Sequence, residues 1–283
     1  MDDIRVPLVD SSFSPYSKSA SLREENKDVH PTYFRWAKEP PYTDGMPTFY
    51  TDNAILANDT FADNAVAWLL EPRCLRPENY EAAKAKAHLF KAVLSYDIEF
   101  LKGIHNGRWY ALGGSSISFD KWGIYPKTKD VCMFVSDKRT TEGHQLRHAI
   151  MEKFGDRIDC YGEGADRPVK SKFEVLKDYQ YCVVVESCWI EGYFTEKIID
   201  ALSMGCMVFY WGHQNYWRNV RGVRLFSDID SLKMHLDYRI YRGYIKNDAE
   251  KIIHQAKPFR ICEDHIFHVN SDLSPRNHFY EQR

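Results

Sequence analysis

Apolar runs alternate with stretches of helical periodicity through the second half of the chain. A stretch at 141–154 and a second one after Thr195 repeat apolar side chains at helical spacing, and a short helix is predicted at 173–177. The apolar runs between them have strand character and lie at 131–136, 181–186 and 207–212. Strands that alternate with helices predict an α/β fold with a parallel, doubly wound sheet. Ligands bind such sheets at the carboxyl ends of the strands.

The first half of the chain is patterned less regularly. An alanine-rich helix is predicted at 79–89, and residues 10–48, rich in Ser, Pro, charge and aromatics, predict long ordered loops with short helices. Strands are predicted at 4–9, 48–51, 64–72 and 92–98. The polar break at 126–130 predicts a boundary between an N-terminal domain, 1–126, and a second domain, 127–245. A helix is predicted at 228–236, and a second one at 248–256 belongs to a C-terminal segment, 246–283, whose helices close the fold.

Composition excludes several classes of protein. The 283 residues are 44% hydrophobic and 28% charged, as in an ordinary soluble globular protein. A formal net charge of -2 gives no sign of a nucleic-acid partner. No apolar stretch approaches the ~18 residues of a membrane span, and the first thirty residues lack a signal peptide, so we expect a cytoplasmic protein. The 14% of aromatic residues suits sugar binding or ordinary core filling.

The seven cysteines are odd in number and show no C-x-x-C spacing. Several lie inside apolar runs. This pattern predicts reduced thiols in a reducing compartment rather than a disulfide framework. A bacterial or viral origin would be compatible with it.

The stretch Tyr193-Phe194-Thr195-Glu196-Lys197 has the features of a helix start behind a strand. Thr195 is a suitable N-cap, and the apolar face that follows runs to a stop at Gly205. A helix N-terminus at the mouth of a parallel sheet favours an anionic ligand.

The segment 181–212 resembles the α-1,3-fucosyltransferases, an inverting family that uses GDP-fucose. The resemblance is carried by Y-F-T-E-K at 193–197 and by Tyr210-Trp211-Gly212, and it extends over roughly 60–245. Weaker matches occur before this segment, in the same order as in the family, at 68–72, 94–97, 135–136 and 159–162. The resemblance implies a GT-B fold, in which two Rossmann-like domains face each other across a cleft and the second holds most of the donor nucleotide.

The same resemblance places Glu71 as the general base. Inverting transfer needs one carboxylate to take a proton from the attacking acceptor hydroxyl. Glu71 could instead close a strand end or pair with Arg73, and Asp63 is the nearest competing carboxylate.

The donor site implied by the resemblance includes two cations for the leaving diphosphate. Arg147 matches the family's diphosphate-binding arginine, and Lys197 lies in the first turn of the capped helix. Glu196 matches the ribose-binding glutamate, although it would also stabilise the helix dipole. Contacts to donor sugar, diphosphate or base are further expected from Glu186, Tyr193, Thr195, Tyr161 and Gly162, the last two also explicable as a turn.

No metal or other cofactor is expected beyond the nucleotide sugar. The only D-x-D, Asp228-Ile229-Asp230, precedes a predicted helix and favours capping over metal binding. Neither the pair His144 and His148 nor a C-terminal group supplies a complete ligand set, so both are interpreted as structural. The C-terminal group consists of Cys262, Asp264, His265 and His268.

Departures from the family pattern lie near the expected donor site. The chain has V-E-S-C at 185–188 where the family has F-E-N-(S/T), and Val208 where proline is common. We therefore expect a metal-independent inverting glycosyltransferase that moves a sugar onto a glycan hydroxyl, with GDP-fucose as donor or a UDP-pentose such as UDP-xylose as the alternative. A non-catalytic nucleotide-sugar or glycan-binding module and a nucleotide-sugar hydrolase are the alternatives from other classes.

Overall fold

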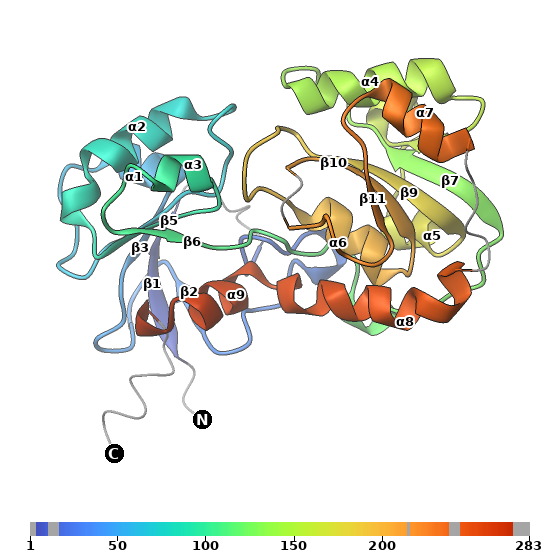
Figure 1. Ribbon diagram of the computed structural model, residues 1–283. Coiled ribbons are helices and arrows are strands. Elements are labelled where there is room, and N and C mark those ends of the chain that lie inside the picture. The colour runs from blue at the N-terminus through green and yellow to red at the C-terminus, as the bar shows by residue number, and fades with distance from the viewer. Residues whose placement is uncertain (1–3, 11–16, 214–215, 238–243, 274–283) are drawn as a thin grey trace. The chain divides into compact units, whose positions relative to one another are not determined.

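The computed structural model describes residues 4–10, 17–213, 216–237 and 244–273, which form two compact units (Figure 1). Unit 1 comprises Met1–Leu22, Lys27–Leu112 and Ile261–Arg283. Unit 2 comprises Arg23–Asn26 and Gly113–Arg260. These units divide the chain at other points than the expected 1–126, 127–245 and 246–283. The closing segment is split because helix α8 (Tyr244–Ala256) contacts helix α6 of unit 2, whereas helix α9 (Cys262–Val269) packs within unit 1.

Unit 1 is built on a parallel sheet with the strand order β2-β1-β3-β4-β5-β6. Its strands are β1 (Arg5–Val9), β2 (Arg35–Ala37), β3 (Phe49–Thr51), β4 (Val66–Trp68), β5 (Ala92–Ser95) and β6 (Gly107–Trp109). The strands predicted at 4–9, 48–51, 64–72 and 92–98 are confirmed in shortened form. Strands β2 and β6 were not predicted; each is three residues long and lies at an edge, where few side chains are buried.

Helices and loops cover both faces of this sheet. On one face, α1 and α2 pack over a core that includes Tyr50, Ala67 and Val93. On the other, Phe267 of α9 meets Phe49 at a ring-centroid distance of 6.0 Å. The remaining helical elements are α1 (Asp52–Ala57), α2 (Pro77–Ala85), α3 (Ile98–Leu101), η2 (Ala87–Leu89) and η6 (Ser271–Leu273).

Unit 2 contains a second parallel sheet, with the order β11-β10-β9-β7-β8. Its strands are β7 (Lys129–Phe134), β8 (Asp159–Tyr161), β9 (Tyr179–Val185), β10 (Met207–Trp211) and β11 (Val223–Leu225). The apolar runs at 131–136, 181–186 and 207–212 are therefore confirmed as neighbouring central strands. β11 was not predicted, because only its first residue is buried.

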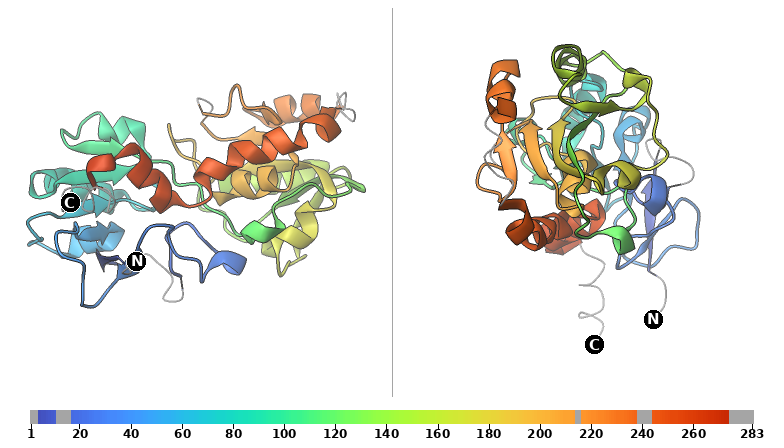
Figure 2. Two further views of the ribbon diagram at one scale, coloured as in Figure 1. Left: turned by 90° about the horizontal axis from the view of Figure 1, so that it is seen from below. Right: turned by 90° about the vertical axis from the view of Figure 1, so that its right-hand side faces the viewer.

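Helices lie on both faces of the second sheet (Figure 1; Figure 2). Ile150 and Phe154 of α4 and Leu232 of α7 join one core with the strands. On the opposite face, α6 contacts β9, β10 and α8, and α5 contacts β9. The elements are α4 (Glu142–Phe154), α5 (Lys172–Leu176), α6 (Glu196–Ser203), α7 (Ile229–Asp237), η1 (Glu24–Asn26), η3 (Phe119–Lys121), η4 (Glu163–Ala165) and η5 (Lys257–Phe259).

The caps of two helices follow the sequence signals. Thr141 caps α4 in a reciprocal capping box with His144. Thr195 caps α6, accepting a hydrogen bond from Lys197 N at 3.4 Å, as predicted. Gly205, just beyond α6, has a φ of +66°, the left-handed conformation that ends many helices.

The prediction that all seven cysteines are reduced is wrong at two positions. Cys74 and Cys188 are disulfide-bonded, whereas Cys132, Cys160, Cys182, Cys206 and Cys262 are free. Disulfides are uncommon in reducing compartments, so the cysteine pattern does not support one. In the described parts of the chain, no helix combines the length and apolar character that crossing a membrane requires.

Helix α4 approaches the chain after β9 so closely that only glycine fits at position 143. A Cβ there would lie 1.8 Å from the carbonyl oxygen of Glu186. We expect Gly143→Ala to push α4 off residues 186–187 and to lower the free energy of unfolding by ~1–3 kcal/mol or more. Gly123→Ala is the matched control, since its Cβ would meet nothing nearer than 3.6 Å. Thermal unfolding measures both, and equal melting of the two variants would contradict this packing.

Candidate donor-binding site

A hollow of about 320 Å³ opens in unit 2 where the strands of its sheet end. Its walls include Val135 and Ser136, directly after β7, and Gly162, directly after β8. Helices α4 and α6 contribute Arg147, Glu196, Lys197 and Asp200 to its lining. The carboxyl edge of a parallel sheet is the expected place for a ligand. We refer to this hollow as the strand-end pocket.

Arg147 is a buried cation with spare hydrogen-bonding capacity. Its side chain is 5% exposed, and its Nε donates to the carbonyl oxygen of Val185 at 3.0 Å. Its Nη2 has no hydrogen-bond partner among the described residues. Burial lowers the pKa of Arg147, and the negative charge of Glu186 offsets part of this lowering. An anionic group in the pocket would satisfy the free donor.

Lys197 enters the same pocket from the first turn of α6. Its Nζ donates to Oγ1 of Thr195 at 2.9 Å and lies 3.5 Å from Oε2 of Glu186. Glu186 is fully buried and accepts from the N–H of Thr195 at 3.0 Å and from its hydroxyl at 2.8 Å. Glu186 thus fastens the start of α6 to the end of β9. Neither Glu186 nor Thr195 is among the residues that line the pocket.

Glu196 is flanked by two lysines. Its Oε1 lies 3.8 Å from Nζ of Lys197 and 3.5 Å from Nζ of Lys172. Burial alone would raise the pKa of Glu196, but Lys197, Lys172 and Arg23 outweigh it and hold the pKa well below its usual range. The carboxylate is therefore ionised and able to accept hydrogen bonds from a ligand's hydroxyl groups.

Lys172 is itself held by a fully buried carboxylate. Its Nζ lies 2.9 Å from Oδ2 of Asp200 and 3.3 Å from the hydroxyl of Ser116. The other oxygen of Asp200 accepts from the N–H of Ser116 at 2.8 Å and from the hydroxyl of Ser115 at 3.0 Å. Burial lowers the pKa of Lys172, but Asp200, Glu196 and Glu24 outweigh it and raise the pKa overall. These contacts fix the charged side chains of Lys172 and Asp200 in the lining of the pocket.

The remaining predicted donor residues divide between backbone and core. Gly162 lines the pocket with a φ of +106°, and a Cβ there would lie 2.3 Å from the carbonyl oxygen of Val135. Tyr161 is buried, and its hydroxyl is 2.8 Å from that of Tyr179. Tyr193 is also buried. Neither tyrosine is among the lining residues, so of the predicted donor set the pocket brings together Arg147, Gly162, Glu196 and Lys197.

Several lining residues were missed by sequence reasoning. Asp200 carried a signal, because it follows Glu196 by one helical turn and interrupts an otherwise apolar stretch. Arg23, Glu24 and Ser116 carried none, since they lie in short or irregular segments far from the helix-start motif. Lys172 is the first residue of α5, just before the helix predicted at 173–177, and nothing near it indicates a ligand.

Glu71 lies in unit 1, three residues beyond β4, and its side chain is exposed. The N–H groups of Leu70 and Glu71 donate to Oδ1 of Asp52 at 2.9 and 3.3 Å, and the hydroxyl of Tyr80 donates to the carbonyl oxygen of Glu71 at 3.1 Å. Asp52 is 1% exposed and has a positive φ of 32°. Arg73 forms an ion pair with Asp97 at 3.0 Å. The alternative role of Glu71 as the ion-pair partner of Arg73 is therefore not supported.

The alternative metal-binding groups have structural contacts. Asp228 accepts from the N–H of Ser231 at 2.7 Å, which confirms its capping role before α7. His144 belongs to the capping box of α4, and burial lowers its pKa to about 4. His265 accepts from the N–H of Ala111 at 3.2 Å. Within the described ranges, no three or more His, Cys, Asp or Glu side chains are grouped to hold a metal ion.

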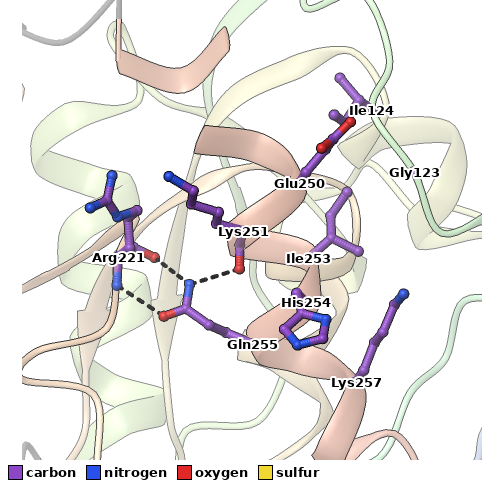
Figure 3. A pocket seen from close by; sticks show the side chains of 9 residues that line it. All are labelled: Gly123, Ile124, Arg221, Glu250, Lys251, Ile253, His254, Gln255 and Lys257. Carbon is purple, nitrogen blue, oxygen red and sulfur yellow. Dashed lines mark hydrogen bonds between the residues drawn. The ribbon is translucent and has the colours of Figure 1, made fainter. Parts of the chain in front are cut away.

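A second, wider hollow of about 860 Å³ runs along α8 (Figure 3). Gln255 fixes one side of it, accepting from the N–H of Arg221 at 3.1 Å and donating to its carbonyl oxygen at 3.3 Å. Lys251 of α8 and Lys257 of η5 also line it. This second hollow is lined by none of the residues predicted from the sequence to bind the donor.

Comparisons with known proteins agree with this arrangement. Residues 124–246 match the family described as glycosyltransferase family 10 (fucosyltransferase), C-terminal part. The match therefore covers β7 to α7, the elements that carry most of the strand-end pocket. No match was found among curated protein sequences.

Solved structures show the same fold at low sequence identity. An α1,3-fucosyltransferase matches with a TM-score of 0.52 and 14% identity, over 87% of this chain and 85% of the other. The structure of an α1,3-fucosyltransferase with GDP matches with a TM-score of 0.50 and 13% identity, over the same shares. TarM matches with a TM-score of 0.50 and 12% identity over 77% of this chain, which spans 52% of the TarM chain. The α/β, GT-B-like fold class is confirmed.

Proposed function

Since the chain is a divergent, fucosyltransferase-like glycosyltransferase, as the family match over residues 124–246 indicates, we propose that it transfers fucose from GDP-fucose to a hydroxyl of a glycan. The proposal includes inversion at the anomeric carbon and no requirement for a metal ion. The solved fucosyltransferase with GDP supports the choice of nucleotide.

The observation that carries the proposal is the pair of cations at one end of the strand-end pocket. Arg147 offers an unpartnered Nη2, and Lys197 stands at the N-terminus of α6. Departure of a nucleoside diphosphate builds negative charge, which such a pair would neutralise without a metal ion. The buried guanidinium is fixed by Val185, so little reorganisation is needed when the charge develops.

The reaction also needs a general base and a residue that binds the nucleoside of the donor. Glu71 would take the proton from the acceptor hydroxyl as its oxygen attacks the anomeric carbon from the side opposite the leaving diphosphate. Inversion follows from this single displacement. Asp52 and Tyr80 would hold the Glu71 backbone in place. Glu196, kept ionised by its two lysines, would accept hydrogen bonds from the ribose.

The experiment is a screen of nucleotide sugars by thermal shift and by turnover, with and without a glycan acceptor. We expect GDP-fucose to raise Tm and to be consumed only when acceptor is present. Consumption without acceptor would instead indicate a hydrolase, and a Tm shift without any turnover would indicate a binding module. A larger shift with UDP-xylose would replace the proposed donor.

The metal requirement is tested in the same assay. We expect turnover to be unchanged by EDTA, because Arg147 and Lys197 carry the charge of the leaving group. Activity that EDTA abolishes and Mn²⁺ restores would contradict the metal-free mechanism.

A further inference from the structure

A tetrapeptide from the N-terminal region is built into unit 2. Residues Arg23–Asn26 belong to this unit although the chain on either side of them belongs to unit 1. Their backbone is bonded to the segment after residue 113: Arg23 N donates to Ser115 O at 3.2 Å, and Glu25 N donates to Ser116 O at 3.3 Å. We name residues 23–26 the inserted tetrapeptide.

Two side chains fix the inserted tetrapeptide further. Asn26 is 1% exposed and donates to the carbonyl oxygen of Ile117 at 2.7 Å. The carboxylate of Glu25 accepts from the N–H of Ser118 at 3.0 Å, lies 3.2 Å from Nζ of Lys121 and accepts from the hydroxyl of Ser171. The tetrapeptide is therefore a rigid part of the unit that contains the strand-end pocket.

Glu24, between these anchors, faces the pocket instead. It lines the pocket and is exposed to solvent, and its carboxylate forms no hydrogen bond to any of the described residues. Its φ is +48°, a conformation that residues other than glycine rarely adopt. Burial and the carboxylates of Asp200 and Glu196 raise the pKa of Glu24, while Lys172 opposes them. A strained residue with a free carboxylate has no evident structural task, which is a reason to look for a functional one.

The charges in the pocket place Glu24 at the end away from the diphosphate cations. Glu196 has Lys197 on one side and Lys172 on the other, and Lys172 leads on to Asp200. Glu24 belongs to the Lys172 end, because the N–H of the next residue, Glu25, donates to the carbonyl oxygen of Ser116 at 3.3 Å, and the hydroxyl of the same Ser116 lies 3.3 Å from Nζ of Lys172. If the diphosphate lies at Arg147 and Lys197 and the ribose at Glu196, the base extends toward Glu24.

We propose that Glu24 is a specificity-determining residue that selects guanine as the base of the donor nucleotide. This inference rests on the proposed function, because it uses the same pocket and the same nucleotide-sugar donor. The buried, unpartnered Nη2 of Arg147 independently points to a ligand in this pocket.

The selection follows from the hydrogen-bonding groups that guanine and uracil present at their edges. Guanine presents two donors side by side, N1–H and the exocyclic N2 amine, which match the two oxygens of one carboxylate. Uracil presents a single N3–H between two carbonyl oxygens, and a carboxylate would repel those oxygens. A bidentate match of this kind discriminates between bases by roughly 10- to 100-fold.

The test compares GDP and UDP binding by calorimetry, without turnover. In the wild-type protein we expect GDP to bind more tightly by ~10- to 100-fold. In Glu24→Gln the amide supplies one acceptor and one donor, so GDP binding should weaken, UDP binding should hold or improve, and the preference should fall close to unity. Glu174→Gln is the matched control, since Glu174 is an exposed acid of the same unit that pairs with Lys177 at 2.6 Å outside the pocket, and its neutralisation should leave the preference unchanged.

Glu24→Gly separates this role from a structural one. Glycine relieves the left-handed backbone, so Tm should rise by ~2–4 °C while the preference for GDP is lost. Asp166→Gly, with a φ of +51° outside the pocket, should gain stability and keep the preference.

The outcomes distinguish the inference from the function on which it rests. Binding of neither nucleotide to the wild-type protein would refute the proposed function. Binding of both with no preference, or a preference that survives Glu24→Gln or is lost in Glu174→Gln, would overturn the role of Glu24 alone.

Discussion

Replacing Arg147 by lysine is expected to lower kcat/KM by ~10²–10³-fold. Arg147 uses Nε to bond the carbonyl oxygen of Val185 and leaves Nη2 free for a ligand. A lysine has a single charged nitrogen and cannot serve both positions. We therefore expect the loss in the chemical step and in GDP binding together, measured by steady-state kinetics and calorimetry.

Arg157→Lys is the control for this substitution. Arg157 follows the same helix, and its Nη2 lies 2.9 Å from Asp237 near the surface, outside the pocket. Its replacement should leave both measurements unchanged. Because Arg147 is buried, Tm of each variant must be recorded as well. An Arg147→Lys protein that melts like the wild type and keeps its activity would contradict the diphosphate role.

Replacing Glu71 by glutamine is expected to lower kcat by ~10²–10⁴-fold with little change in donor binding. The amide keeps the size of the side chain but cannot take a proton. The bonds that hold this position use the backbone N–H and carbonyl oxygen, so they survive the substitution. Kinetics with saturating donor and acceptor measure the loss, and calorimetry with GDP measures the retained binding.

Glu78→Gln provides the matched control in the same unit. Glu78 is exposed in the first turn of α2 and lies 3.8 Å from Arg76, so its neutralisation should leave kcat unchanged. Full activity of Glu71→Gln would leave Asp63 as the carboxylate to test next.

Local signals were sufficient for the elements of unit 2 that carry the site. The start of α6 could be read from Thr195, since a side chain that caps its own helix needs no distant partner. The central strands could be read from their apolar runs, because strands buried on both faces exclude polar residues. Arg147 and Glu196 were found through a resemblance, and the structure shows both lining one pocket.

Short and irregular segments could not be predicted from local sequence signals. Edge strands β2, β6 and β11 are three residues long and carry few buried side chains, so they lack a periodic pattern. The disulfide-bonded state of Cys74 and Cys188 was missed for a different reason: nothing in the spacing of the seven cysteines marks either of them.

The sequence by itself therefore determined the fold class, the capped helix and the class of ligand expected at its N-terminus, because each depends on neighbours within a few residues. Only the tertiary structure decided which charges surround Glu196. Lys172 reaches it from the first turn of α5, and Glu24 enters the pocket through four residues separated from the rest of their unit by nearly ninety positions. Such contacts leave no periodic trace along the chain, since they arise when the packing of distant segments brings polar groups together and burial strengthens their interaction.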